Sequence, residues 1–149
     1  MAVVGVHKIE KLFKEVSSLK LDKNKVKEIS NLVDDKLYDL LVVAQENTKY
    51  NGRDVIWLSD LPLTKAFKES MKKFEELEEE LELKQILEHL ATMPPLRYDL
   101  EIELEQKLPL IAGTLLYILA LIAKEFSPKD RSLSSEDLKR VADILNLMI

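Results

Sequence analysis

A 27-residue stretch without glycine or proline, from Asn24 to Tyr50, constrains the fold more than any other feature of this sequence. As a single α-helix it would extend about 40 Å, at a rise of about 1.5 Å per residue. That length is large for a chain of 149 residues. Gly52 follows directly, and glycine is the residue type expected just past a helix end. The sequence therefore predicts one long helix that ends close to Tyr50.

A short extended segment and another helix are predicted to follow. The run Val55–Trp57 is apolar and lies between two charged residues of opposite sign, Arg53 and Asp60. Ser59 or Asp60 is expected to cap the next helix, with Pro62 near its first turn. An ion pair between Arg53 and Asp60 would close this segment, which we call the first strap (residues 53–60).

The order of a short helix, a long helix, a strap and a short helix resembles the histone fold. The residues that carry the resemblance are Arg53-Asp54-Val55-Ile56, then Ser59-Asp60-Leu61. Archaeal histones have Arg-x-Thr-Ile in the same place, followed by an acidic residue and Asp-Ile. The resemblance implies that Arg53 and Asp60 pair inside the fold as a structural element without activity.

The chain also matches itself at a displacement of 77 residues, which indicates an internal repeat. The matching pairs are Lys20 with Arg97, Asp22 with Asp99, Ile56 with Leu133, Asp60 with Asp137, and Leu61 with Leu138. A short amphipathic helix is predicted in each half, from Ile9, Leu12, Phe13 and Val16 and from Leu83, Ile86, Leu87 and Leu90. We therefore expect one fold in residues 1–74 and a second in residues 75–149, with long helices of matching length. An acidic helical run, residues 75–82, would join them.

The second long helix is expected at about residues 99–126. It contains no charged residue from Leu108 to Ala123, yet a membrane span needs roughly 20 such residues. The sequence therefore predicts a buried central helix and no membrane association. Pro109 is expected to kink this helix, because proline removes a backbone hydrogen bond and clashes with the preceding turn.

A histone fold covers half of its apolar surface with a partner fold, and two folds in one chain can supply that partner internally. The whole chain resembles tandem histone-fold proteins of prokaryotes, including a widespread bacterial group with no assigned activity. The resemblance implies an all-α protein in which the two folds form an intramolecular handshake pair, as a monomer. Only three glycines and 33% charged residues in long periodic segments also favour an all-helical chain. The abundance of Lys and Glu with few glycines hints at a thermophile.

The formal net charge of −5 is unevenly distributed along the chain. Residues 1–74 contain 14 Lys or Arg and 11 Asp or Glu, a difference of +3. Residues 75–149 contain 8 and 16, a difference of −8. The two halves are therefore expected to face different partners.

In the histone family, DNA is contacted by the first short helices and by two ends where the loop of one fold meets the strap of the other. Those contacts reach phosphates without reading bases. The residues that the resemblance assigns to this role are Lys11, Lys14, Lys20, Lys23, Lys129, Arg131 and Ser132. The handshake would gather the last five at one end, and it would place Arg97 beside Asp54 and Val55 at the other. One end is suited to phosphate and the other is not.

Two functions remain open on these grounds. The first is weak, salt-sensitive, sequence-independent binding of double-stranded DNA, with the protein in the cytoplasm and at the nucleoid. The alternative is a protein-interaction scaffold without DNA binding, in which the acidic first helix of the second half docks a basic protein partner. The negative total charge opposes the usual basic footprint of a nucleic-acid-binding protein.

An enzyme is the least supported class. The chain has no cysteine, no glycine-rich phosphate loop and no HExxH spacing. Its two histidines, His7 and His89, are not paired with a recognisable catalytic partner. We therefore expect no catalytic residue, no cofactor and no metal site. Trp57 and Tyr98 are expected to be packing residues, relevant to binding only if the ligand were single-stranded.

Overall fold

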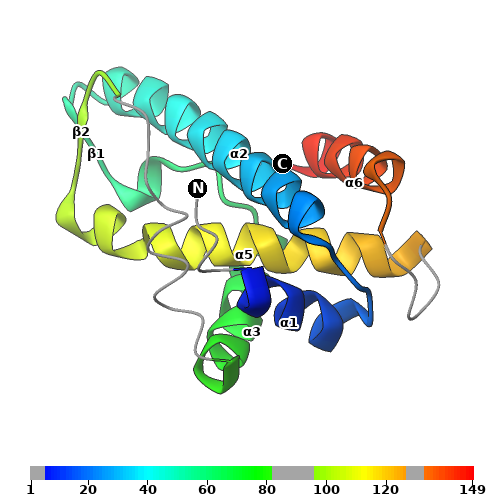
Figure 1. The fold of residues 1–149 in the computed structure, drawn as a ribbon. Coiled ribbons are helices and arrows are strands. Elements are labelled where there is room, and N and C mark those ends of the chain that lie inside the picture. Colours follow the sequence, from blue (N-terminus) through cyan, green and yellow to red (C-terminus); the bar gives the residue numbers. More distant parts are fainter. Residues whose placement is uncertain (1–5, 82–95, 127–132) are drawn as a thin grey trace.

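The computed structural model describes residues 6–81, 96–126 and 133–149, and it is mostly helical (Figure 1). The all-α class is confirmed at this level, with the addition of a small two-stranded sheet. The elements in chain order are α1 (Val6–Ser17), α2 (Lys23–Tyr50), β1 (Val55–Ile56), the 3-10 helix η2 (Leu58–Asp60), α3 (Lys65–Leu81), β2 (Asp99–Leu100), α5 (Ile102–Phe126) and α6 (Ser135–Met148).

The long helix α2 begins and ends within one residue of the predicted limits. Asp22 caps its first turn, because the Asp22 carboxylate accepts a hydrogen bond of 2.9 Å from the backbone N–H of Lys25. At its other end Gly52 has a φ of +70°, a left-handed conformation that glycine adopts without a steric penalty. Local residue types are therefore sufficient to fix both ends of α2.

The helix after the first strap starts later than the sequence suggested. Residues 58–60 form only the 3-10 turn η2, and α3 begins at Lys65, where the hydroxyl of Thr64 accepts a hydrogen bond from the N–H of Phe67. Neither Ser59 nor Asp60 therefore caps α3. Leu61 is extended, with φ −71° and ψ 138°, as expected for the residue before a proline. Pro62 thus separates the 3-10 turn from α3.

Helix α5 lies at the centre of the molecule, with α2 and α6 on one side and α1 and α3 on the other (Figure 1). Its length and composition alone would allow a membrane span, but 61% of the apolar stretch is buried inside the fold. This burial agrees with the predicted central helix. Pro109 lies inside α5, and the helix continues on both sides of it. Side chains of α5 with no exposed surface are Leu104, Ile111, Ala112, Thr114, Leu115, Ala120 and Ala123.

The two long helices are tied together at both ends. Strands β1 and β2 pair in parallel, with Val55 opposite Asp99, which joins the end of α2 to the start of α5. At the other end the N–H of Leu133 donates a hydrogen bond of 3.3 Å to the carbonyl of Lys20. This bond joins the loop before α2 to the segment that follows α5. Helices α2 and α5 therefore run in opposite directions.

The internal repeat is visible at the straps. The carboxylate of Asp60 accepts a hydrogen bond from the N–H of Trp57, and the carboxylate of Asp137 accepts one from the N–H of Ser134. Both pairs are related by the predicted displacement of 77. The long helices, however, begin at Lys23 and Ile102, 79 positions apart. The single displacement therefore holds at the straps and differs by two residues at the start of the long helices.

The limit drawn at residues 74 and 75 falls inside α3, which continues without a break to Leu81. Phe74 is fully buried and Leu77 is packed against the core, so this part of α3 belongs to the same hydrophobic core. The first helix predicted for the second half, with Leu83, Ile86, Leu87 and Leu90, lies outside the described residues.

Candidate nucleic-acid interface

Helix α1 presents two lysines to solvent. Ile9, Leu12 and Phe13 are buried against the core, so the opposite face of this amphipathic helix is exposed. Lys11 and Lys14 are both exposed on it. Neither makes an ion pair with any residue in the described ranges. Both ammonium groups are therefore available to an external anion.

The loop after α1 adds two further lysines. Leu19 is fully buried and anchors the loop, whereas Lys20 and Lys23 are exposed. Lys23 is the first residue of α2, where the helix dipole places partial positive charge. Asp22 lies between them, but its carboxylate accepts the N–H of Lys25 and is occupied in capping the helix. The start of α2 is therefore a site of positive potential.

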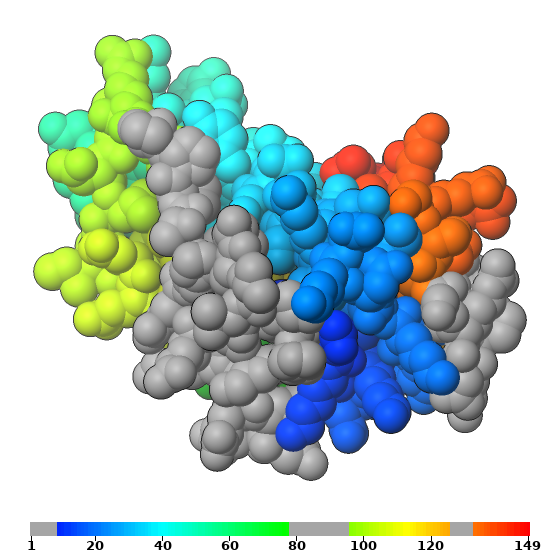
Figure 2. Space-filling view, viewed as in Figure 1, coloured from blue at the N-terminus to red at the C-terminus, as the bar shows by residue number. Residues whose placement is uncertain are grey.

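The remaining three residues assigned to DNA, Lys129, Arg131 and Ser132, lie outside the described residues. The next residue along the chain is Leu133, and its bond to the carbonyl of Lys20 brings this part of the backbone to the first loop. A second link close by is the hydrogen bond of 3.1 Å from the Ser135 hydroxyl to the Glu28 carboxylate. In Figure 2 the orange start of α6 accordingly lies against the blue surface of α2. We call the set Lys11, Lys14, Lys20 and Lys23 the basic end.

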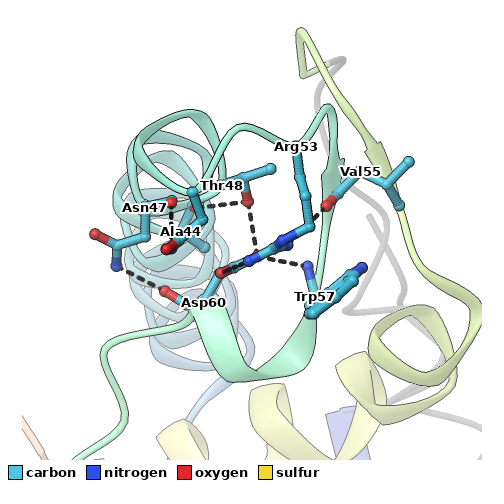
Figure 3. A network of polar contacts seen from close by, with 8 residues as sticks. Ala44, Asn47, Thr48, Arg53, Val55, Trp57 and Asp60 are labelled. Atoms are coloured by element: carbon cyan, nitrogen blue, oxygen red, sulfur yellow. Dashed lines mark hydrogen bonds and ion pairs between the residues drawn. The ribbon is translucent and has the colours of Figure 1, made fainter.

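The opposite end is built around the carboxylate of Asp60, which is 4% exposed (Figure 3). The Arg53 guanidinium donates two hydrogen bonds to it, of 2.7 and 2.8 Å. The Thr48 hydroxyl and the Trp57 N–H each donate one more, both of 2.8 Å. These donors hold the pKa of Asp60 well below its usual range, with Arg53 the largest contributor. The hydrogen bonds from Arg53 to the carboxylate in turn raise the pKa of Arg53.

Two donors around Asp60 were not expected from the sequence. Thr48 and Asn47 lie in the last turns of α2, and the Asn47 amide donates a hydrogen bond of 2.8 Å to the Asp60 carbonyl. Nothing in the residue types distinguishes them from other polar helix residues. Only the folding of the strap back onto α2 brings them to Asp60.

The surface at this end carries mainly acidic groups. Asp54, Asp99 and Glu103 are exposed, and Arg97 is an exposed cation among them. Arg53 is occupied by Asp60, so it does not offset these charges. In Figure 2 the lime-coloured residues of β2 lie at the far side of the molecule from the blue α1. We call the set Asp54, Asp99 and Glu103 the acidic end.

The sequence matches one protein family over residues 9–146, described as a domain of unknown function (DUF1931). Two similar proteins of Aquifex aeolicus, both described as uncharacterized, are 29% and 34% identical and cover 95% of this chain; the chain spans 82% and 89% of their lengths. A crystal structure from Thermus thermophilus is similar, with a TM-score of 0.85, 38% identity and 97% of both chains covered. A second, from Aquifex aeolicus, has a TM-score of 0.84 and 26% identity over 100% of both chains. These relatives come from thermophiles, and their descriptions assign no activity.

Proposed function

The chain belongs to the family described as a domain of unknown function (DUF1931), and we propose that it is a tandem histone-fold pair that binds duplex DNA weakly and without sequence preference. Its binding surface is the basic end together with residues 129–132. The acidic end does not contact DNA. The protein is a non-enzymatic, architectural component of the nucleoid.

Reciprocal contacts between the two halves support the histone-fold part of this proposal. The first strap pairs with the loop before α5 through β1 and β2. The loop before α2 bonds to Leu133, which lies in the strap of the second half. In a handshake each loop meets the strap of the other fold, and this exchange is symmetric. The two matching carboxylate caps, at Asp60 and Asp137, add to the case.

The hydrogen bond between Leu133 and Lys20 carries the DNA-binding part of the proposal. It brings the segment that contains Lys129, Arg131 and Ser132 to exposed lysines at the start of a long helix. Lysine and arginine side chains displace counterions from phosphates, and a helix N-terminus favours the same anion. Few cations are involved and the total charge is −5, so binding is weak and sensitive to salt.

The test is fluorescence anisotropy of a labelled duplex of ~40 base pairs over a salt series. We expect binding at low salt, with log K falling by about 0.9 per phosphate neutralised for each tenfold rise in salt. The double variant Lys20→Glu/Arg131→Glu should bind more weakly and reduce that slope by up to about 1.8.

The matched control is Lys49→Glu/Arg97→Glu. It replaces one exposed lysine and one exposed arginine, as the test variant does, but at the other end of the molecule. The control changes the total charge equally, so an equal loss of binding in both variants would exclude a localised basic end. Absence of binding at low salt in the natural protein would exclude DNA binding altogether.

The second candidate is an acidic scaffold for a basic protein partner. The acidic first helix assigned to this role by the sequence lies outside the described residues. The observation that favours the candidate is the acidic end, where exposed carboxylates adjoin the exposed apolar side chains of Val55 and Ile102. A partner that co-purifies after nuclease treatment, and is lost when Asp54 and Asp99 are replaced by lysine, would support it.

A further inference from the structure

A cleft of about 780 Å³ lies between the first strap, α3 and α5. This volume is within the range of small-molecule sites, which is roughly 300–1,000 Å³. Its walls include the apolar side chains of Leu61, Leu63, Met71 and Leu110. The cleft is beside the acidic end, and no residue assigned to DNA borders it. Its function is therefore separate from the proposed DNA contact.

Three lysines border this cleft. Lys68 and Lys72 lie one turn apart on α3, and Lys107 lies on α5. All three are exposed, and none forms an ion pair with another residue in the ranges that the structure describes. Two elements therefore contribute uncompensated ammonium groups to one cavity. Carboxylates of Glu101 and Glu103 also border it and can accept hydrogen bonds from hydroxyl or amino groups.

Trp57 supplies an aromatic surface at the edge of the cleft. The Arg53 guanidinium lies 3.7 Å from its ring centroid and holds the indole in place. Arg53 is fixed in turn by its two hydrogen bonds to Asp60. The Trp57 side chain is nevertheless 43% exposed and borders the cavity. An exposed tryptophan that is held rigid is a preorganised stacking surface for a planar ring.

We propose that this cleft binds a small planar anion, an aromatic ring system that carries a phosphate or carboxylate group, such as a nucleoside monophosphate. The ring stacks on Trp57 and contacts Leu63 and Met71. The anionic group binds the ammonium groups of Lys68, Lys72 and Lys107. Ligand hydroxyl or amino groups donate to Glu101 and Glu103, which accounts for both signs of charge in one cavity.

Trp57 is the one tryptophan of the chain, so its fluorescence reports directly on this cleft. We expect titration with AMP, excited at the red edge of the indole band, to change the emission saturably. Adenosine and inorganic phosphate should each bind more weakly than AMP, because each lacks one of the two recognised groups. Lys68→Glu/Lys72→Glu should weaken AMP binding by roughly tenfold or more, the equivalent of one lost charged contact.

The matched control is Lys65→Glu/Lys73→Glu, which makes the same charge change on the same helix at exposed lysines that do not border the cleft. The control should bind AMP like the natural protein. Equal weakening by both variants, or no saturable response to AMP, would overturn the proposal. Calorimetric titration of Trp57→Phe and Trp57→Ala provides a second measurement, since only the alanine variant removes the stacking ring.

Discussion

At the scale of residues, Asp60 organises the first strap. Arg53 and Asp60 are seven positions apart in the sequence and meet through two hydrogen bonds because the strap turns back at η2. The same carboxylate accepts from Thr48 and from the Trp57 N–H, so a buried negative charge is balanced by four donated bonds. Such a charge is tolerated in a protein interior only when it is paired and hydrogen-bonded.

Replacement of Asp60 by asparagine should lower the free energy of unfolding at pH 7 by about 3 kcal/mol, because it leaves Arg53 without its partner. The pKa of Asp60 is depressed in the folded protein, so its stabilising contribution is complete above about pH 3.9, the unfolded value, and is lost as the pH falls below it. Urea denaturation between pH 3 and pH 7 measures both effects. The variant should lose less stability than the natural protein in the acid range.

The control for this measurement is Asp54→Asn, an exposed carboxylate in the same strap. It should change stability by less than about 0.5 kcal/mol. Parallel pH profiles for the natural protein and Asp60→Asn would show that Asp60 does not carry the acid sensitivity.

At the scale of elements, α5 determines how the other helices pack. Its uncharged face is covered by α1, α2, α3 and α6, so an apolar helix of this length is buried without a membrane. Pro109 lies in its second turn, is half-buried and cannot donate to the carbonyl of Glu105. The helix persists there because the surrounding helices cover its apolar side chains, which outweighs one missing hydrogen bond.

Pro109→Ala should therefore stabilise the protein by about 1 kcal/mol, less than the full propensity difference of about 3 kcal/mol because the helix is already adapted to the ring. Thermal unfolding followed by circular dichroism measures the change. Gln106→Ala, at an exposed position in the same turn, is the comparison and should have little effect. A decrease in stability for Pro109→Ala would show that contacts of the proline ring matter more than the lost hydrogen bond.

At the scale of the whole molecule, the two ends differ in charge while the backbone contacts at each are of the same kind. Lysines gather where the first loop meets Leu133, and carboxylates gather where β1 meets β2. Helices α2 and α5 are already covered by one another and by the short helices. An apolar groove of about 720 Å³ between α3, α5 and the end of α6 is the part of the core left open, bordered by Phe67, Ile118, Ile122, Ile144 and Met148.

We predict that the protein is a monomer in solution, because the main apolar faces of both long helices are covered within the chain. Light scattering after size exclusion should give a mass close to 17.2 kDa at all concentrations tested. A mass twice as large would contradict the prediction. Ile144→Lys, which places a charge in the open groove, would then identify whether that groove is the contact.

The sequence by itself determined the limits of α2, the amphipathic face of α1, the central position of α5 and the Arg53–Asp60 spacing. Each of these depends on local residue types or on periodicity, which act over a few residues. It misplaced the cap of α3, because the restriction imposed by Pro62 on Leu61 outweighed the capping preference of Ser59 and Asp60.

Only the tertiary structure decided which distant segments meet. Thr48 reaches Asp60, Leu133 reaches Lys20, and Lys68, Lys72 and Lys107 border one cleft through contacts between separate elements. These contacts depend on how helices cross around α5, and no local pattern encodes a crossing. The two-residue difference in displacement between the straps and the long helices arises for the same reason. Loop lengths adjust until both ends of the long helices close, so spacing is set by closure of the fold.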